Sequence, residues 1–156
     1  MQIEKFNPLD NEMFQVMNEK GEIVQEDAMP DVSEEDIRAL YRYMRKSRVV
    51  DNTALSLQRQ GRMLTYAPNL GQEAAQVGSG YALKETDWAV PAFRELGMWL
   101  IKGWTVEKIF KYWYGSEWGS HFGEEKRLLP ISVPIASHFQ HAVGIGMASA
   151  CARKTT

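Results

Sequence analysis

Small residues recur at helical spacing in two separate stretches of the chain, and this feature limits the folds open to it more than any other. The first stretch reads as a helix from Gly71 to about Leu83, and the second reads as a helix over 137–152. The small residues are Ala74, Ala75, Gly78 and Ala82 in the first helix, and Ala142, Gly146 and Ala150 in the second. Because alanine and glycine on a helix face let another backbone come close, we expect both helices to pack tightly. The first should be centrally buried.

A long, basic-faced helix is predicted before these two. Ser33 is followed by three acidic residues, a typical helix start, because serine caps the first amides and acids favour the positive end of the helix dipole. Good helix formers then continue until Gly61, which supplies the left-handed residue that commonly ends a helix. The pattern predicts a helix over 34–60, and similar signals predict a shorter one over 105–114.

Extended segments are short and few. Residues 1–30 read as an arm with two extended pieces around a turn at 18–21, and they offer few apolar residues to bury. Trp88–Val90 suits a buried parallel strand, and Leu129–Ile135 reads as extended. Strands that alternate with small-residue helices indicate an α/β fold, here helix-rich and with an incomplete parallel sheet. We expect an arm over 1–30 and one domain over 31–156.

Charge and hydropathy exclude several classes of partner. The 18 basic and 20 acidic residues, a formal net charge of −2, are spread along the chain, so no basic stripe exists to neutralise a phosphate backbone. No apolar run approaches the roughly 20 residues that span a bilayer, and the first residues lack the charged-then-apolar order of a secretory signal. We therefore expect a cytoplasmic protein that binds neither nucleic acid nor membrane.

Four segments, in their order and spacing, resemble one known family. They are Gln58-Arg59-Gln60-Gly61-Arg62, Tyr66-Ala67-Pro68 with Gly71-Gln72-Glu73-Ala74, Phe93-Arg94-Glu95, and Ile131-Ser132-Val133-Pro134-Ile135-Ala136-Ser137. The series is similar to the amino-terminal half of the alpha subunit of the thiamine-diphosphate-dependent component of 2-oxoacid dehydrogenase complexes. With the acidic arm and the helix that contains Gly144, the resemblance covers nearly the whole chain.

The resemblance implies roles for four residues. In that family the alpha subunit binds the diphosphate end of thiamine diphosphate and a beta subunit holds the aminopyrimidine, so the site lies between subunits. Arg94 would bind the diphosphate, because the planar fork of donors of an arginine suits a doubly charged phosphate better than a lysine does. Phe93, where relatives commonly have tyrosine, would pack beside the cofactor without a hydroxyl contact. The main-chain groups of Val133 and Ile135 would face the aminopyrimidine.

The same resemblance implies two metal sites. Ser132, Pro134 and Ser137 resemble a monovalent-cation site of branched-chain relatives, although His138 stands where glutamine is expected. In the family, magnesium bridging the diphosphate is held by a Gly-Asp-Gly motif and a downstream asparagine, which would lie beyond Thr156. We therefore expect the magnesium ligands outside this chain, and weak cofactor binding and no turnover by this piece alone.

The activity implied is oxidative decarboxylation of a 2-oxoacid, most closely pyruvate, with acyl transfer to a lipoyl group. The implied partners are a beta subunit, a second alpha subunit and the lipoyl acyltransferase component. The arm and the Tyr66-Ala67-Pro68 segment favour pyruvate, whereas 132–136 also resembles branched-chain 2-oxoacid dehydrogenases, which stay open as an alternative. A noncatalytic interaction subunit derived from the family is a further alternative.

Overall fold

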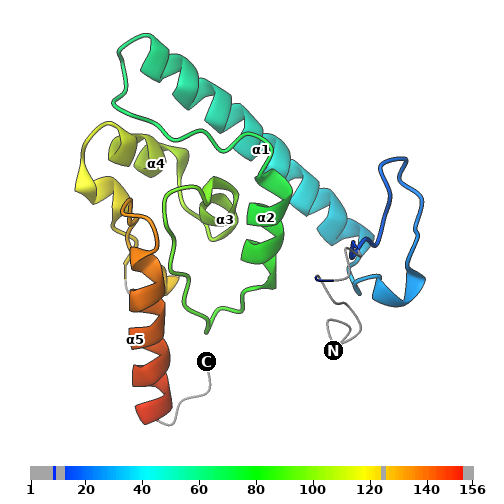
Figure 1. Cartoon of the computed structure of the whole chain (residues 1–156). Helices are drawn as coiled ribbons and strands as arrows, with labels where there is room; N and C mark the ends of the chain where they lie inside the picture. The colour runs from blue at the N-terminus through cyan, green and yellow to red at the C-terminus, as the bar shows by residue number, and fades with distance from the viewer. Residues whose placement is uncertain (1–8, 10–12, 124–125, 153–156) are drawn as a thin grey trace. The chain divides into compact units, whose positions relative to one another are not determined.

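A computed structural model describes residues 9, 13–123 and 126–152 of the chain. The chain divides into two compact units, residues 1–37 and 38–156, and the boundary falls inside the first long helix. Most of the first twelve residues of the predicted arm, and the last four residues of the predicted domain, lie outside the described part. Every secondary-structure element in the described part of the chain is an α-helix or a 3-10 helix (Figure 1).

The described part of the first unit is built around a tight turn. Met17 and Ile23 form an isolated antiparallel bridge, and the amide of Gly21 donates to the carbonyl of Asn18 at 3.0 Å. A single turn of 3-10 helix, η3 (Glu26–Ala28), follows. The two extended pieces around a turn at 18–21 are therefore confirmed.

Helix α1 (Glu34–Arg59) begins and ends where local signals place it. The Ser33 hydroxyl accepts the amide of Asp36 at 3.1 Å, which caps the first turn. At the other end Gly61 has a φ of 69°, a left-handed conformation that glycine adopts without steric cost. The buried face lies in the carboxy-terminal half of the helix, and its residues are Ser47, Val50, Asp51 and Ala54.

Helices α2 (Glu73–Ala82) and α3 (Leu96–Ile101) lie side by side (Figure 1). Glycine permits this approach. A Cβ atom on Gly97 would lie 2.8 Å from Cγ2 of Val77, and one on Gly80 would collide with the side chain of Ile101 and lie 3.1 Å from Cα of Met98. The two backbones are therefore closer than any side chain at these positions allows.

The close packing of α2 uses a different face from the predicted one. Its buried residues are Glu73, Gln76, Val77 and Gly80, whereas all four small residues singled out in the sequence (Ala74, Ala75, Gly78 and Ala82) are exposed. Central burial of the small-residue face is therefore wrong for this chain. Residue size alone predicted burial of the alanine face, whereas the buried face is the one whose polar residues, Glu73 and Gln76, have hydrogen-bond partners inside the fold.

An aromatic core joins α3 to the helix that follows it. Helix α4 (Val106–Trp113) is capped by Thr105, whose hydroxyl accepts the amide of Lys108 at 3.3 Å, and η4 (Glu117–Ser120) packs against it. The rings of Trp99 and Trp104 meet edge to face, with centroids 5.1 Å apart. The largest fully buried apolar side chains are those of Trp99, Leu96, Leu100, Ile109 and Val77.

The expected parallel sheet is reduced to one pairing. Ala89 and Leu128 form an isolated parallel bridge, in which the Ala89 amide donates to Arg127 O at 2.8 Å and the Leu129 amide donates to Ala89 O at 3.0 Å. No longer strand forms among the residues that the structure describes. Ala89 lies in the predicted strand 88–90 and Leu128 directly precedes the predicted extended segment 129–135, but among the described residues neither segment forms a strand and no sheet is found.

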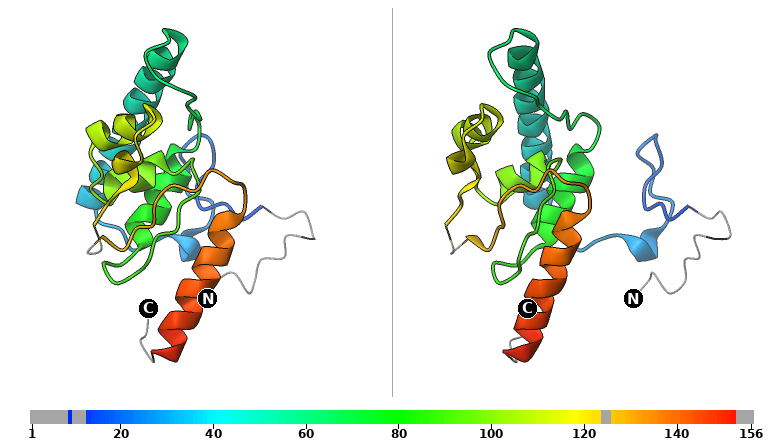
Figure 2. Two further views of the ribbon diagram at one scale, coloured as in Figure 1. Left: turned by 90° about the vertical axis from the view of Figure 1, so that its left-hand side faces the viewer. Right: turned by 60° about the vertical axis from the view of Figure 1, so that its left-hand side comes forward.

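Helix α5 (Ser137–Cys151) forms over the predicted range, yet none of its residues is buried. Both views in Figure 2 show it extending away from the other helices of its unit. Ala142, Gly146 and Ala150, expected to mediate close packing, are exposed. None of the described helices has both the length and the apolarity that crossing a bilayer requires.

From the α2–α3 contact we predict opposite changes in the free energy of unfolding when two glycines of α2 are replaced by alanine. Gly80→Ala should lower the free energy of unfolding by about 1 kcal/mol, because overpacking outweighs the gain in helix propensity. Gly78→Ala, at a position with nothing within 4 Å of the added Cβ, should raise it by up to about 1 kcal/mol. Urea unfolding of both variants measures the difference; equal effects would contradict the packing described.

Candidate functional site

Arg94 lies on the short segment that leads into α3, with its guanidinium at the surface. Its Nη1 donates to the carbonyl oxygen of Pro68, and its Cζ lies 5.6 Å from the centroid of the Phe93 ring. Phe93 is half-buried and packs against the aromatic core. Arginine carries five N–H donors, so the exposed fork offers further donors after the bond to Pro68.

A main-chain hydrogen bond brings the second predicted segment to the first. The amide of Ser132 donates to the carbonyl of Ala92 at 2.9 Å, directly beside Phe93 and Arg94 in sequence. Val133 and Ile135 are 50% and 87% exposed. The residues expected to face the two ends of a cofactor therefore belong to one surface.

The turn before α5 contains a non-glycine residue in a left-handed conformation. Ala136 has a φ of 68°, which is uncommon for an alanine and is found at sites where surrounding contacts impose it. The amide of Ser137 donates to the carbonyl of Pro134 at 3.2 Å and closes the turn. The backbone between Pro134 and Ser137 is therefore held in a defined shape.

The three residues that resemble a monovalent-cation site form one hydrogen-bonded cluster. The hydroxyl oxygens of Ser132 and Ser137 lie 2.5 Å apart, and the Ser137 hydroxyl donates to the carbonyl of Pro134 at 2.8 Å. These oxygens are neutral, whereas a divalent cation favours carboxylates. In the described part of the chain, no group of three or more His, Cys, Asp or Glu side chains could hold a metal ion.

Two buried polar atoms flank this surface. Within the described residues, Oε2 of Glu95 and Nδ1 of His138 have no hydrogen-bond partner. Burial raises the pKa of Glu95, against the lowering effect of backbone amides and of His138. This direction of shift disfavours the charged carboxylate, which would repel a phosphate bound beside Arg94.

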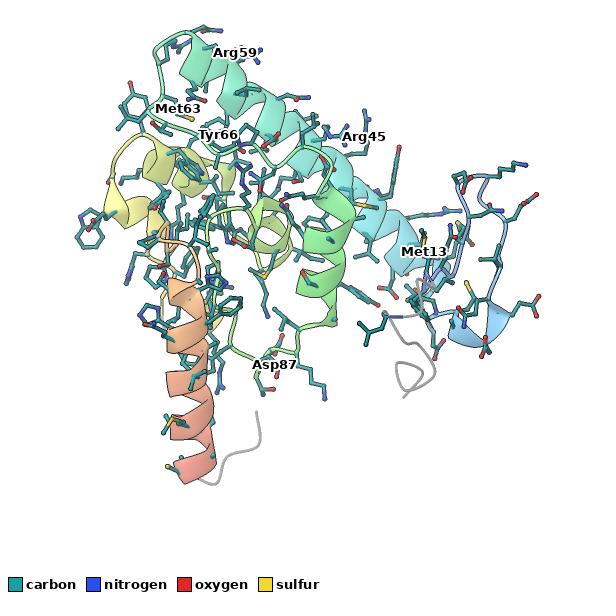
Figure 3. All side chains as sticks on the ribbon, in the orientation of Figure 1. Met13, Arg45, Arg59, Met63, Tyr66 and Asp87 are labelled. Atoms are coloured by element: carbon teal, nitrogen blue, oxygen red, sulfur yellow. The ribbon has the colours of Figure 1, made fainter. Side chains whose placement is uncertain are left out.

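A buried carboxylate on α1 organises the loop that carries Pro68. Oδ1 of Asp51 accepts the hydroxyl of Tyr66 and the amide of Asn69, both at 2.7 Å. Burial, and then the bond to Asp51, raises the pKa of Tyr66 above its ordinary value. The ring of Tyr66 meets Trp113 of α4 edge to face at 5.2 Å, and Figure 3 shows Tyr66 on the segment that returns from the end of α1.

The network continues through two amide side chains. Nε2 of Gln76 donates to Oδ1 of Asn69 at 2.9 Å and to the carbonyl of Arg94 at 2.5 Å. Oε1 of Gln76 accepts the amide of Gly97 at 2.8 Å. Gln76 therefore uses both ends of its carboxamide to hold the segment that contains Arg94.

An ion pair fastens the start of α2 to α1. Nε of Arg48 lies 2.5 Å from Oε1 of Glu73, and the Gly71 amide donates to the same carboxylate at 3.1 Å. The hydrogen bond from Arg48 is the largest cause that lowers the pKa of Glu73 to about 2. The amides at this helix start are thus engaged by a carboxylate of the chain itself.

Sequence reasoning missed the residues that support the surface. Asp51, Asn69 and Gln76 are inconspicuous polar residues in the sequence, and several of their hydrogen-bond partners are 15 to 27 positions away. One signal was present: on the predicted helix, Asp51 lies beside Val50 and Ala54, two residues of types that are often fully buried.

Comparison with known proteins adds independent information. The sequence model of the family described as "Dehydrogenase E1 component" matches residues 41–156. The chain is 44% identical over 132 residues to "Pyruvate dehydrogenase E1 component subunit alpha" of Acholeplasma laidlawii, covering 85% of the chain and 38% of that protein. It is 36% identical over 140 residues to the protein of the same name from Mycoplasma genitalium, covering 90% of the chain and 39% of that protein.

A relative with a different substrate in its name is similarly close. The chain is 42% identical over 119 residues to "3-methyl-2-oxobutanoate dehydrogenase subunit alpha" of Mycobacterium tuberculosis, covering 76% of the chain and 32% of that protein. The chain therefore spans between 32% and 39% of the length of these three relatives.

The Arg48–Glu73 pair predicts a pH-dependent loss of stability. Because folding lowers the pKa of Glu73 from 4.5 to about 2, its contribution is complete above pH 4.5 and is lost as the pH falls toward 2. At pH 7, Glu73→Gln should lower the free energy of unfolding by about 1 kcal/mol, since Arg48 stays half-exposed.

The measurement is urea unfolding of wild type and Glu73→Gln from pH 7 to pH 2.5. The difference between the two proteins should shrink below pH 4.5. Glu85→Gln, the same change at an exposed position, serves as the control. A constant difference across this range would show that the Glu73 charge does not contribute.

Proposed function

Because the chain belongs to the dehydrogenase E1 component family, we propose that it is the amino-terminal part of a pyruvate dehydrogenase alpha subunit. The whole enzyme would decarboxylate pyruvate oxidatively and pass the acyl group to a lipoyl group. Residues 31–156 would form the first part of the thiamine-diphosphate-binding domain, with a parallel sheet started by the Ala89–Leu128 bridge, and residues 1–30 would form an arm.

The observation that carries the proposal is the surface shared by Arg94 and the 132–137 turn. Arg94 presents an exposed fork whose orientation is set by Pro68, as a binding site for a diphosphate requires. Phe93 supplies an apolar wall, and the exposed residues Val133 and Ile135 would offer their main-chain groups to the aminopyrimidine end. When bound, thiamine diphosphate supplies a nucleophilic carbon and an electron sink, while the protein binds and orients it.

Other components would complete the site. Magnesium would be held by ligands outside this chain, and Ser132, Pro134 and Ser137 would hold a monovalent cation through neutral oxygens. A beta subunit, a second alpha subunit and the lipoyl acyltransferase would be the partners. The exposed helix α5, which carries no Asp, Glu, Lys or Arg, supports contact with further protein.

Pyruvate is favoured as the substrate, and a branched-chain 2-oxoacid is the second candidate. Relatives named as pyruvate dehydrogenase subunits match at 44% and 36% identity over 85% and 90% of the chain, whereas the 3-methyl-2-oxobutanoate dehydrogenase relative matches over 76%. Comparing kcat/KM of the assembled enzyme for pyruvate and for 3-methyl-2-oxobutanoate decides between them. A higher value for the branched substrate would reassign the enzyme.

The proposal predicts that Arg94 controls cofactor affinity. In the full-length alpha subunit assembled with its beta subunit, Arg94→Ala should raise the dissociation constant of thiamine diphosphate with Mg²⁺ at least tenfold, or about 1.4 kcal/mol. Calorimetry measures the constant directly. Arg45→Ala removes a similar exposed arginine from α1 and should leave it unchanged; an equally small effect of Arg94→Ala would remove Arg94 from the site.

A further inference from the structure

The side chain and the main chain of Arg94 are held by two different parts of the buried network. The guanidinium donates to the carbonyl of Pro68, on the loop after α1. The main-chain carbonyl accepts Nε2 of Gln76, on α2. The side chain of an exposed arginine is normally free to adopt many rotamers. The two attachments restrict Arg94 to far fewer.

Gln76 holds the turn before α3 from both sides of its carboxamide. Its nitrogen binds the carbonyl of Arg94 and its oxygen binds the amide of Gly97, at 2.5 and 2.8 Å. The side chain is 6% exposed, so water cannot readily replace these bonds. The backbone at Arg94 is therefore attached to the buried face of α2.

Asp51 acts on the guanidinium through a peptide plane. The bond between Pro68 and Asn69 is a planar trans peptide, so its C=O and N–H point in opposite directions. The Asn69 amide donates to the Asp51 carboxylate at 2.7 Å. This bond turns the Pro68 carbonyl away from α1, and that carbonyl accepts Nη1 of Arg94.

We propose that Asp51 and Gln76 are positioning residues that fix the Arg94 guanidinium for the diphosphate of thiamine diphosphate. Gln76 sets the position of the arginine main chain, and Asp51 sets the direction of the carbonyl that orients its fork. The inference rests on the proposed function of Arg94. Neither residue touches the cofactor, and each acts before it binds.

Paired substitutions of Asp51 separate hydrogen bonding from charge. Each hydrogen bond that the described residues make to this side chain ends on Oδ1, so Asp51→Asn keeps an acceptor there, whereas Asp51→Leu removes it. In the full-length assembled enzyme, Asp51→Leu should raise the dissociation constant of thiamine diphosphate with Mg²⁺ at least fivefold by calorimetry. Asp51→Asn should restore it to within about twofold of wild type.

Tyr66→Phe is the matched structural control. It removes another hydrogen bond from the same carboxylate but leaves the bond between Asp51 and the Asn69 amide. It should lower stability without changing cofactor affinity by more than about twofold. A loss of affinity in Tyr66→Phe as large as in Asp51→Leu would overturn the positioning role, since general destabilisation would then explain both.

Gln76→Met tests the second attachment and covers the case in which Asp51→Leu does not assemble. It should raise the dissociation constant at least fivefold and raise the KM for thiamine diphosphate, with kcat at saturating cofactor within about twofold of wild type. Gln60→Met, the same change at an exposed position, should have no effect. An unchanged dissociation constant in Gln76→Met would overturn the proposal.

The Arg94→Ala background distinguishes this inference from the proposed function. If Gln76 acts through Arg94, Gln76→Met should add less than twofold to the loss already caused by Arg94→Ala. Additive losses would overturn the positioning role and leave the function of Arg94 intact. If Arg94→Ala alone does not weaken binding, the proposed function of Arg94 fails, and the positioning role fails with it.

Discussion

The folded arrangement of the second unit depends on one buried carboxylate. Asp51 is 1% exposed in the middle of α1, and an unpaired charge there would be strongly unfavourable. Its donors come from the loop after the helix, where Tyr66 and Asn69 each contribute one at 2.7 Å. The loop therefore has to return along α1, and the start of α2 is placed where the loop ends.

The hydrogen bonds to Asp51 also fix the positions of the helices that follow. Asn69 accepts Nε2 of Gln76, and Gln76 in turn binds the main chain at Arg94 and Gly97, where α3 starts. Tyr66 connects the same carboxylate to α4, because its hydroxyl binds Asp51 while its ring packs against Trp113. Tyr66 thus takes part in both the polar network and the aromatic core. The core and the candidate site therefore both depend on Asp51.

Features that depend on near neighbours in sequence were predictable. The limits of α1 follow from Ser33 and Gly61, and the start of α4 follows from Thr105, because caps and left-handed glycines act within one turn. Arg94 could be singled out by family resemblance, and its assignment to a diphosphate stays a prediction. The turn at 132–137 proved to lie beside it through the Ser132–Ala92 hydrogen bond.

Features that depend on distant partners were not predictable. The face of α2 that packs was misjudged, since Gln76 looks like a surface residue until its partners on two other segments are known. The parallel sheet was expected from short apolar runs, but pairing depends on segments distant in sequence, and the described residues supply the single pairing of Ala89 with Leu128. The small residues singled out on α2 and α5 are all exposed, and the close packing occurs instead at Gly80 and Gly97, where α2 meets α3.

Because buried residues hold Arg94, part of the conformational entropy of its side chain is lost on folding. An arginine side chain loses about 2 kcal/mol of rotamer entropy when it is fixed. Here the Pro68 carbonyl and the Phe93 ring restrict the side chain in the absence of any ligand, so part of that loss belongs to folding and not to ligand binding. The carbonyl is itself aimed by a carboxylate that must be satisfied for α1 to pack at all. Orientation of the exposed guanidinium and stability of the buried helix are therefore coupled, and a substitution that frees the arginine also leaves a buried polar group without its partner.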